Sequence, residues 1–339
     1  MNIVNNTHFN INPFFFQGLH LKDLKSAGEG YHQVIPALRT NDNFTMETGN
    51  AAFVHKDYEI LSSYRETLHT KFHTDISSVD FSVSDVAAET INSWVSDMTN
   101  KKIQQLVEKN MIDATTRLIL VNALYFKGDW DKQFDVKKTR SEEFSVSENK
   151  KVDVDMMRIT SEFPFAQLKD LDVKMIELPY KGDRVVMQIV LPNKHSGLSD
   201  VQKKLEEGNV DLNKVFQQEQ RKIKIDLKLP KFKLSQSHDL SSVLQDLGMK
   251  DMFVAGKADF SGMDGSRNLY VGFVKQDVFV EVNEEGSEAA AATGVGLMLR
   301  SMPLPPEQFL VDHPFMFYLR DKLTGMLLFQ ARVSDPTNN

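Results

Sequence analysis

The sequence predicts a mixed α+β fold with large antiparallel or mixed sheets. Helical patterns dominate its early part and strand patterns its later part, without the regular alternation that marks a doubly wound parallel sheet. Residues 117–126 (RLILVNALYF) are almost wholly apolar, which is typical of a strand covered on both faces. Residues 222–229 (KIKIDLKL) alternate strictly, which is typical of a strand with one exposed face. Together these patterns indicate sheets buried to different degrees.

The remaining elements follow in chain order. Residues 86–98 carry apolar side chains at helical spacing, with Ser84 or Asp85 in position to cap the helix. Residues 173–178 and 185–191 predict a hairpin around Gly182. Later segments predict a helix at 240–247 that ends at Gly248 and a strand pair at 315–319 and 326–333.

Composition excludes several classes of protein. The chain has 339 residues, a formal net charge of -7 and no cysteine, so it has no disulfide or thiolate chemistry and no bulk charge that favours nucleic acid or anionic membranes. There is no membrane-spanning apolar run and no secretory leader pattern. Sequons begin at Asn5 and Asn43, where glycans would be attached in a secreted protein.

Catalytic signatures are missing from the sequence. It contains no G-x-S-x-G elbow, P-loop, H-E-x-x-H or G-x-G-x-x-G motif, so we predict neither an enzyme nor a cofactor. The densest histidine group, His55, His69 and His73, fits ordinary surface histidines better than a metal site. The lysine-rich stretch 221–233 is explained more simply by the solvated face of a strand than by a polyanion site.

The segment from Glu284 to Ser301 is the most informative one. Its small residues are compatible with an exposed helix start or a flexible linker. However, it lies between a strand-like run at 278–282 and a proline-bearing stretch at 303–306, as expected of a long exposed loop. A loop that becomes a strand must point alternate side chains into the sheet. The inward positions are all small, and Gly286 is a permissive hinge before them: Ser287, Ala289, Ala291 and Thr293.

This segment resembles the hinge of the serpins, a family of serine protease inhibitors. The hinge motif is VNEEGSEAAAAT at 282–293, which comprises Glu285, Gly286, Ser287, Glu288, Ala289, Ala290, Ala291, Ala292 and Thr293. Further segments match in the expected order: TGNAAFV at 48–54, INSWV at 91–95, LVNALYFKGDW at 120–130, LKLPKFKL at 227–234, DFSGM at 259–263 and HPFMFYLRD at 313–321.

The resemblance implies three β-sheets with surrounding helices and an exposed reactive-centre loop in a single domain. A protease that cleaves the loop becomes trapped as an acyl-enzyme when the loop inserts into the main sheet. Family spacing from Gly286 places the scissile bond at Arg300-Ser301, and arginine there suits a trypsin-like protease, whose pocket carries a carboxylate. A slip in register would instead offer Met298 or Leu299 to chymotrypsin-like or elastase-like proteases.

The resemblance also assigns structural residues of the mechanism. Trp130 matches a tryptophan where the loop first enters the sheet, and Asn122 matches a buried asparagine beneath the strands that part. Gln276 departs from the pattern, because many relatives carry a histidine there, but glutamine still donates and accepts hydrogen bonds.

Residues 1–17 are foreign to the family pattern. The sequence Phe14-Phe15-Phe16-Gln17 is what a splice acceptor would encode, so we expect residues 1–17 to be translated intron and 18–339 to be a serpin domain without its first helices. The expected location is extracellular by family tendency, and the expected form is a monomer. Dispersed basic residues such as Lys22, Lys25 and Lys151 define no glycosaminoglycan site.

Two other functions remain open at this point. One is a non-inhibitory serpin used for binding, transport or chaperoning, or a chain whose truncation leaves it a plain protease substrate. The other is an enzyme with an unrecognised site, which the missing catalytic motifs disfavour.

Overall fold

The computed structural model describes residues 29–30, 44–207, 221–284 and 305–338. The chain divides into two compact units. The first includes Thr45–Phe126 and Ser235–Val280, and the second includes Lys127–Leu234 and Glu281–Asn339.

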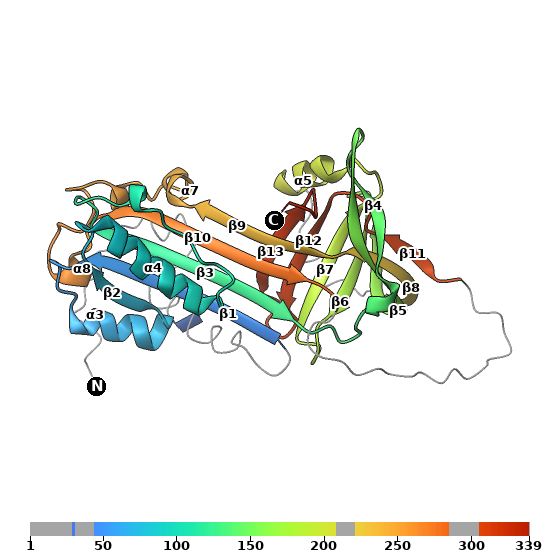
Figure 1. Cartoon of the computed structure of the whole chain (residues 1–339), viewed down its shortest axis with the longest axis horizontal. Helices are drawn as coiled ribbons and strands as arrows, with labels where there is room; N and C mark the ends of the chain where they lie inside the picture. Colours follow the sequence, from blue (N-terminus) through green and yellow to red (C-terminus); the bar gives the residue numbers. More distant parts are fainter. Residues whose placement is uncertain (1–28, 31–43, 208–220, 285–304, 339) are drawn as a thin grey trace. The chain divides into compact units, whose positions relative to one another are not determined.

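A five-stranded sheet is the centre of the first unit (Figure 1). Its order is β2-β1-β3-β10-β9, with β1 at Phe44–His55, β2 at Asp75–Val79, β3 at Leu118–Gly128, β9 at Phe232–Asp239 and β10 at Val271–Val282. The pairs β1–β2 and β3–β10 are both parallel. The β3–β10 ladder runs from the Leu118–Val271 pair to the Phe126–Val280 pair.

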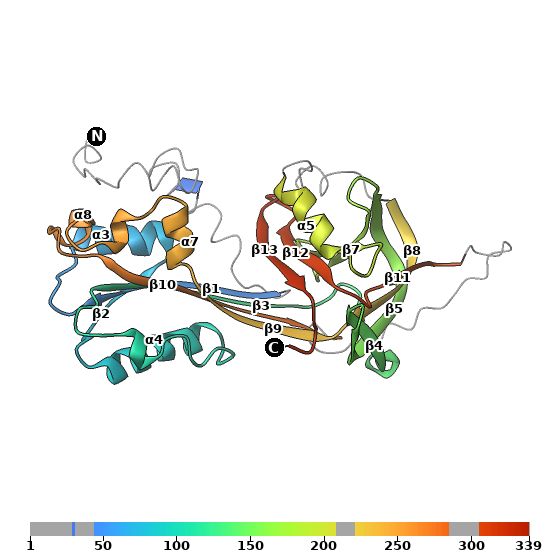
Figure 2. The same ribbon diagram turned by 90° about the horizontal axis from the view of Figure 1, so that it is seen from above.

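Helices cover both faces of this sheet (Figure 2). The helix α4 at Ser84–Met98 lies on one face, and the short helices α3 at Ser62–Thr67, α7 at Ser241–Asp246 and α8 at Ser261–Asp264 lie on the other. Ile119 and Val121 of β3 belong to the core cluster beneath α4, whereas Leu118 belongs to the opposite cluster. The prediction that residues 117–126 form a strand buried on both faces is therefore confirmed.

The predicted helix at 86–98 is confirmed as α4, but the predicted cap is wrong. The N-cap position is Val83, and it makes no side-chain capping bond. Ser84 is already the first residue of the helix, and its hydroxyl donates to the Ile112 carbonyl at 3.0 Å. The first turn contains one acidic residue, Asp85, whose negative charge lies near the positive end of the helix dipole.

Gly49 of β1 explains why the TGNAAFV motif at 48–54 and the INSWV motif at 91–95 occur together. A Cβ atom at position 49 would lie 2.8 Å from the Trp94 ring. Because Trp94 packs in this way, α4 approaches the strand backbone closely, and Trp94 also meets Phe53 edge to face with ring centroids 6.0 Å apart. A side chain at position 49 would therefore have to displace the Trp94 ring or the Met98 side chain.

The second unit contains an eight-stranded sheet of order β11-β8-β5-β6-β7-β12-β13, with β4 paired to β5. The strands are β4 at Arg140–Ser147, β5 at Lys150–Leu168, β6 at Val173–Pro179, β7 at Val185–Pro192, β8 at Arg221–Pro230, β11 at Glu307–Leu310, β12 at Phe315–Asp321 and β13 at Leu327–Val333. The helix α5 at Leu198–Glu206 packs on it through Val201.

The long strand β5 links two parts of this sheet. Its first part pairs with β4 and β8, and its last residues, Phe165–Leu168, pair with β6. One strand of 19 residues therefore joins these two strand groups through continuous hydrogen bonding.

The predicted turns are confirmed where glycine is required. Gly182 between β6 and β7, Gly248 after α7 and Gly325 between β12 and β13 have φ values of 83°, 94° and 73°. A side chain is strained in this left-handed region of backbone conformation. Glycine at these positions therefore fits the sharp ends of these elements.

The strand at 222–229 departs from its predicted pattern at one residue. Ile225, Leu227 and Leu229 are buried as expected, but Asp226 on the other face is also buried, with 4% exposure. Arg158 of β5 makes this possible by donating from Nε and Nη2 to the two carboxylate oxygens at 2.9 and 2.7 Å. A paired carboxylate is tolerated where an unpaired one would not be.

Candidate functional site

The candidate site is the end of β10, at the base of the predicted reactive-centre loop. The loop residues lie at 285–304, outside the described residues, and they include both residues of the expected scissile bond and the whole predicted hinge: Glu285, Gly286, Ser287, Glu288, Ala289, Ala290, Ala291, Ala292, Thr293, Arg300 and Ser301. Asn5 and Asn43 also lie outside the described residues. The structure does describe the residues at both ends of the loop.

Glu284 anchors the first end, immediately before the loop. Its side chain is only 5% exposed, yet it carries a carboxylate. Thr139 donates its hydroxyl to Oε1 at 2.8 Å, and the Lys231 ammonium lies 3.0 Å from Oε2. The Phe134 amide donates to the Glu284 carbonyl at 3.2 Å. Main chain and side chain are therefore both held.

The electrostatics of Glu284 favour its charged form. Burial acts to raise the pKa of Glu284, but hydrogen bonds from Lys231 and Thr139 outweigh it and hold the pKa below its usual range. The carboxylate is consequently ionised at neutral pH. Pulling Glu284 away from its partners would cost charge-assisted hydrogen bonds, which are stronger than neutral ones.

Trp130 holds Asn283, the residue before Glu284. The indole Nε1 donates to the Asn283 carbonyl at 2.9 Å. The ring is 4% exposed and stacks on Tyr180, with centroids 4.4 Å apart and an interplanar angle of 12°. The Trp130–Tyr180 pair also forms an isolated antiparallel bridge, which fixes the backbone beneath the indole. The chain thus leaves β10 over a rigid aromatic platform.

The second end of the loop is tied down by β11. This strand pairs in parallel with β8, with Glu307 opposite Ile225. Phe309 is fully buried, and the Lys174 ammonium donates to the Glu307 carboxylate at 2.8 Å. Both ends of the 285–304 segment are therefore anchored in the second unit.

A second group of predicted residues meets in the first unit, across the β3–β10 pair. Asn122 and Gln276 are register partners, and the Gln276 amide donates to Asn122 Oδ1 at 2.8 Å. The Asn122 amide in turn donates to Asn50 Oδ1 at 2.9 Å and to the Gly49 carbonyl at 3.3 Å. Neutral side-chain amides thus bridge β1, β3 and β10 on one face.

Asp277, next to Gln276, is a buried acid in the same strand. It is 5% exposed, and burial raises its pKa above the usual range for aspartate, although Ser237, Lys275 and His238 act in the opposite direction. Among the described residues, its Oδ1 has no hydrogen-bond partner. The charged form of Asp277 is therefore a source of local destabilisation in β10.

Sequence reasoning named Asn122, Gln276 and Trp130, and the structure brings the first two together. It missed Thr139 and Lys231 as the partners of Glu284.

Lys231 lies within the quoted LKLPKFKL segment, but its charge was interpreted as part of a solvated strand face. The group of closely spaced metal-binding side chains found among the described residues is a different one and does not include His55, His69 or His73.

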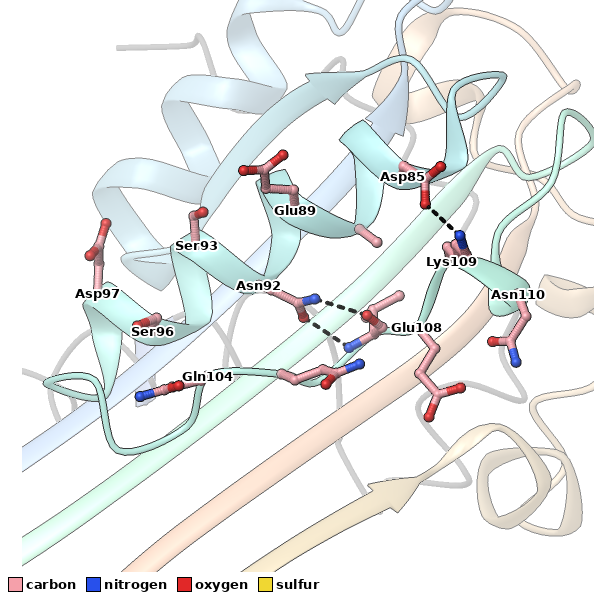
Figure 3. Close-up of a pocket in the computed structure, with 13 residues that line it drawn as sticks. Asp85, Glu89, Asn92, Ser93, Ser96, Asp97, Gln104, Glu108, Lys109 and Asn110 are labelled. Atoms are coloured by element: carbon pink, nitrogen blue, oxygen red, sulfur yellow. Dashed lines mark hydrogen bonds and ion pairs between the residues drawn. The ribbon is translucent and has the colours of Figure 1, made fainter.

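A hollow of about 890 Å³ lies between α4 and residues 104–110 (Figure 3). Asn92 holds this segment against the helix by donating to the Val107 carbonyl and accepting from the Leu106 and Val107 amides, each at 2.9 Å. The hollow is rimmed by exposed carboxylates, including Asp85 and Glu89. Exposed acidic residues on a helix are ordinary solvated groups, so we assign this hollow no ligand.

Comparison with protein-family models matches residues 6–336 to the Serpin (serine protease inhibitor) family. The boundary expected after Gln17 stays a prediction, since residues 1–28 lie outside the described residues. Among the described residues, no helix is long and apolar enough to cross a membrane.

Individual relatives agree with the family match. Human Serpin B3 is 38% identical over 315 residues, which cover 91% of this chain and 80% of the relative. Leukocyte elastase inhibitor A of Mus musculus is 40% identical over 297 residues, which cover 86% and 78%. The crystal structure of Serpin48, described as a highly specific serpin of the insect Tenebrio molitor, has a TM-score of 0.82 and 34% identity, covering 94% of this chain and 84% of that one. Neither the fold nor the family is that of an enzyme, and the chain belongs to the serpin family of serine protease inhibitors.

Proposed function

We propose that this chain is a suicide inhibitor of trypsin-like serine proteases, with Arg300-Ser301 as the scissile bond. The protease serine attacks the Arg300 carbonyl carbon, the Ser301 amine leaves, and an acyl-enzyme forms. The freed loop then inserts into the five-stranded sheet and traps the acyl-enzyme before water can hydrolyse it.

The observation that carries the proposal is the direct parallel pairing of β3 and β10. A strand that follows β10 and folds back between these two would run antiparallel to both. Insertion would replace one parallel ladder with two antiparallel ladders, and antiparallel pairing is slightly more stable per residue. Insertion of the cleaved loop into the five-stranded sheet would therefore be energetically favourable.

Two groups of bonds would change during insertion. The Gln276–Asn122 hydrogen bond crosses the ladder that must open, and the bonds to Asn283 and Glu284 hold the residues from which the inserting strand begins. We propose that these bonds delay insertion until cleavage supplies a free strand. In this proposal they set the barrier and have no catalytic role.

The specificity rests on Arg300, whose position comes from family spacing. A second candidate is an elastase-like or chymotrypsin-like target, with Met298 or Leu299 as the bait. It is favoured by the name of the mouse relative, which is called a leukocyte elastase inhibitor. The two candidates share the insertion mechanism and differ only in the cleaved bond.

The test mixes the purified full chain with trypsin, chymotrypsin or elastase and resolves the products on a denaturing gel. Mass spectrometry then locates the cut. We expect a trypsin complex that survives boiling, with cleavage after Arg300, and its loss in Arg300→Ala. A cooperative thermal transition of the untreated chain shows in advance that the sample is folded.

Other outcomes separate the alternatives. A complex with elastase or chymotrypsin and a cut after Met298 or Leu299 would keep the inhibitory mechanism and overturn the trypsin-like specificity. Cleavage without any complex by a folded sample would overturn inhibition and favour a non-inhibitory or truncation-disabled serpin.

The extracellular location and the monomeric state also stay proposals. The names of the relatives above give no support for secretion. Expression of the full transcript in animal cells, followed by glycosidase treatment of medium and cell fractions, would test it. Glycosylated protein in the medium, with glycans at Asn5 or Asn43, would support secretion, and unglycosylated protein in the cells would overturn it.

A further inference from the structure

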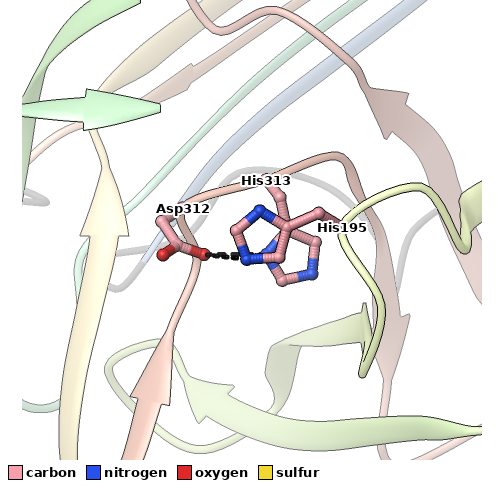
Figure 4. A group of neighbouring side chains, drawn as sticks. All are labelled: His195, Asp312 and His313. Carbon is pink, nitrogen blue, oxygen red and sulfur yellow. Dashed lines mark hydrogen bonds and ion pairs between the residues drawn. The ribbon is translucent and has the colours of Figure 1, made fainter. Parts of the chain in front are cut away.

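We propose that His195, Asp312 and His313 form a binding site for a zinc ion in the second unit. The three side chains each offer one donor atom, and these atoms all lie within 4.8 Å of one another (Figure 4). His195 lies in the segment between β7 and α5, and the other two lie between β11 and β12. Two imidazoles and a carboxylate form a ligand set that zinc accepts readily.

The donor spacing is close to that of a zinc site. His313 Nδ1 lies 2.7 Å from Asp312 Oδ1, and His195 Nε2 lies 3.9 Å from the same oxygen. Ligands about 2.0–2.2 Å from a tetrahedral zinc ion are separated by roughly 3.4 Å. The observed distances fall on either side of this value, so small side-chain movements would suffice.

His313 is already oriented as a ligand. Its Nε2 lies 2.8 Å from the Pro192 carbonyl, which can only accept a hydrogen bond, so Nε2 carries a proton. Nδ1 is then the nitrogen available to a metal. A ligating histidine whose other nitrogen donates to a backbone carbonyl is the usual outer-shell arrangement of zinc sites. The side chain is 6% exposed, which limits its freedom to turn away.

Asp312 supplies negative charge at the same point. Its Oδ1 lies 2.7 Å from His313 Nδ1 and 3.9 Å from His195 Nε2, so this one oxygen faces the donor nitrogens of both histidines. A zinc ion would replace the proton that His313 and Asp312 share, and that proton would be released to solvent.

His195 is the mobile ligand. Its side chain is 57% exposed, and its ring is stacked on His313 with centroids 4.3 Å apart and an interplanar angle of 10°. Figure 4 shows the two rings overlapping beside Asp312. Because parallel rings do not aim their lone pairs at one point, His195 must tilt out of the stack to ligate. Its exposure permits this movement and leaves the fourth position open to water.

Zinc would join two segments that are far apart in sequence. It would link the connection before α5 to the connection before β12, whose Asp312 carbonyl already accepts from the Ser145 amide at 2.8 Å. Binding to the folded state alone raises stability by mass action. The proposal is thus a structural zinc site with one exchangeable ligand position.

The test titrates zinc into the chelator-treated full chain and measures stoichiometry and affinity by calorimetry. We expect one zinc ion per chain, and we expect His195→Ala to weaken binding by at least about tenfold. His69→Ala is the matched control, because His69 is an exposed histidine outside this group, and it should bind zinc like the parent. Cobalt substitution provides a second readout, since tetrahedral cobalt absorbs visible light strongly.

Asp312→Asn keeps the size of the side chain and removes its charge, and it should weaken zinc binding as well. Thermal unfolding without zinc shows that the variants are folded. The proposal is wrong if the parent binds no zinc at about 100 µM, a concentration well above that needed for functional sites. It is equally wrong if His195→Ala and Asp312→Asn both bind zinc as the parent does.

Discussion

The two sheets of this serpin differ in the direction of their strands and in the chemistry that ties the strands together. In the five-stranded sheet, the β1–β2 and β3–β10 pairs are parallel, and neutral amides of Asn122 and Gln276 bridge the second pair. Among the described strands of the eight-stranded sheet, only the β8–β11 pair at one edge is parallel. Two of its buried carboxylates, Asp226 and Asp321, are paired with arginines.

The difference suggests that each sheet is suited to a different task. A ladder held by neutral hydrogen bonds opens at modest cost, because each bond contributes only about 1 kcal/mol net. A buried ion pair that loses one partner leaves an uncompensated charge, which is far more costly. We infer that the five-stranded sheet is built to admit a strand and the eight-stranded sheet to stay closed.

The largest expected effect comes from the face of the hinge that would enter the five-stranded sheet. Ala289→Glu puts a charge on the inward face, whereas Ala290→Glu puts the same charge on the outward face. Burying an unpaired carboxylate costs several kcal/mol, so we expect Ala289→Glu to lower the yield of covalent trypsin complex at least tenfold (about 1.4 kcal/mol).

The Ala290→Glu variant is the matched control and should form complex like the parent. The ratio of complex to cleaved chain on a denaturing gel measures both variants. Equal complex from the two variants would mean that the inserting strand does not have the alternation we expect.

A smaller effect is expected in the eight-stranded sheet at Asp226. Hydrogen bonds from Arg158 lower the pKa of Asp226 and outweigh burial, which acts to raise it. Asp226→Asn should lower the free energy of unfolding by about 1–2 kcal/mol at pH 7, a discounted figure because half of Arg158 stays in water. Since the folded-state pKa is lowered, this stabilisation is present above the usual aspartate pKa and disappears as pH falls through the lowered value.

Urea unfolding at neutral and acidic pH measures this difference. Glu143→Gln is the control, because Glu143 and Lys151 form an exposed pair in the same sheet, and it should unfold like the parent. A destabilisation by Asp226→Asn that persists unchanged at acidic pH would show that charge pairing is not its cause.

The smallest effect is expected at the amide bridge. Gln276→Ala removes the hydrogen bond to Asn122 and should destabilise the β3–β10 ladder by about 1 kcal/mol, which corresponds to roughly fivefold faster hydrogen exchange in these strands. Gln236→Ala changes an exposed glutamine of β9 and should leave exchange unaltered. Exchange by mass spectrometry compares them, and equal rates in both variants would remove the bridge from the opening mechanism.

Local patterns explain why so many elements could be predicted. The alternation in β8, the helical spacing in α4 and the glycines at positive φ each depend on neighbours a few residues away. The burial of Asp226 could not be predicted, because its partner Arg158 is 68 residues distant. The predicted cap of α4 failed because the helix begins at Ser84 itself, one residue earlier than a Ser84 cap requires.

The sequence by itself determined the family, the small-residue hinge and the expected bait Arg300, because these depend on residue type and spacing along the chain. Only the tertiary structure decided that Glu284 is held by Thr139 and Lys231, and that His195 meets His313. Thr139 is 145 residues from Glu284. Partners so distant in sequence are chosen by strand order and register, which no short stretch of sequence encodes.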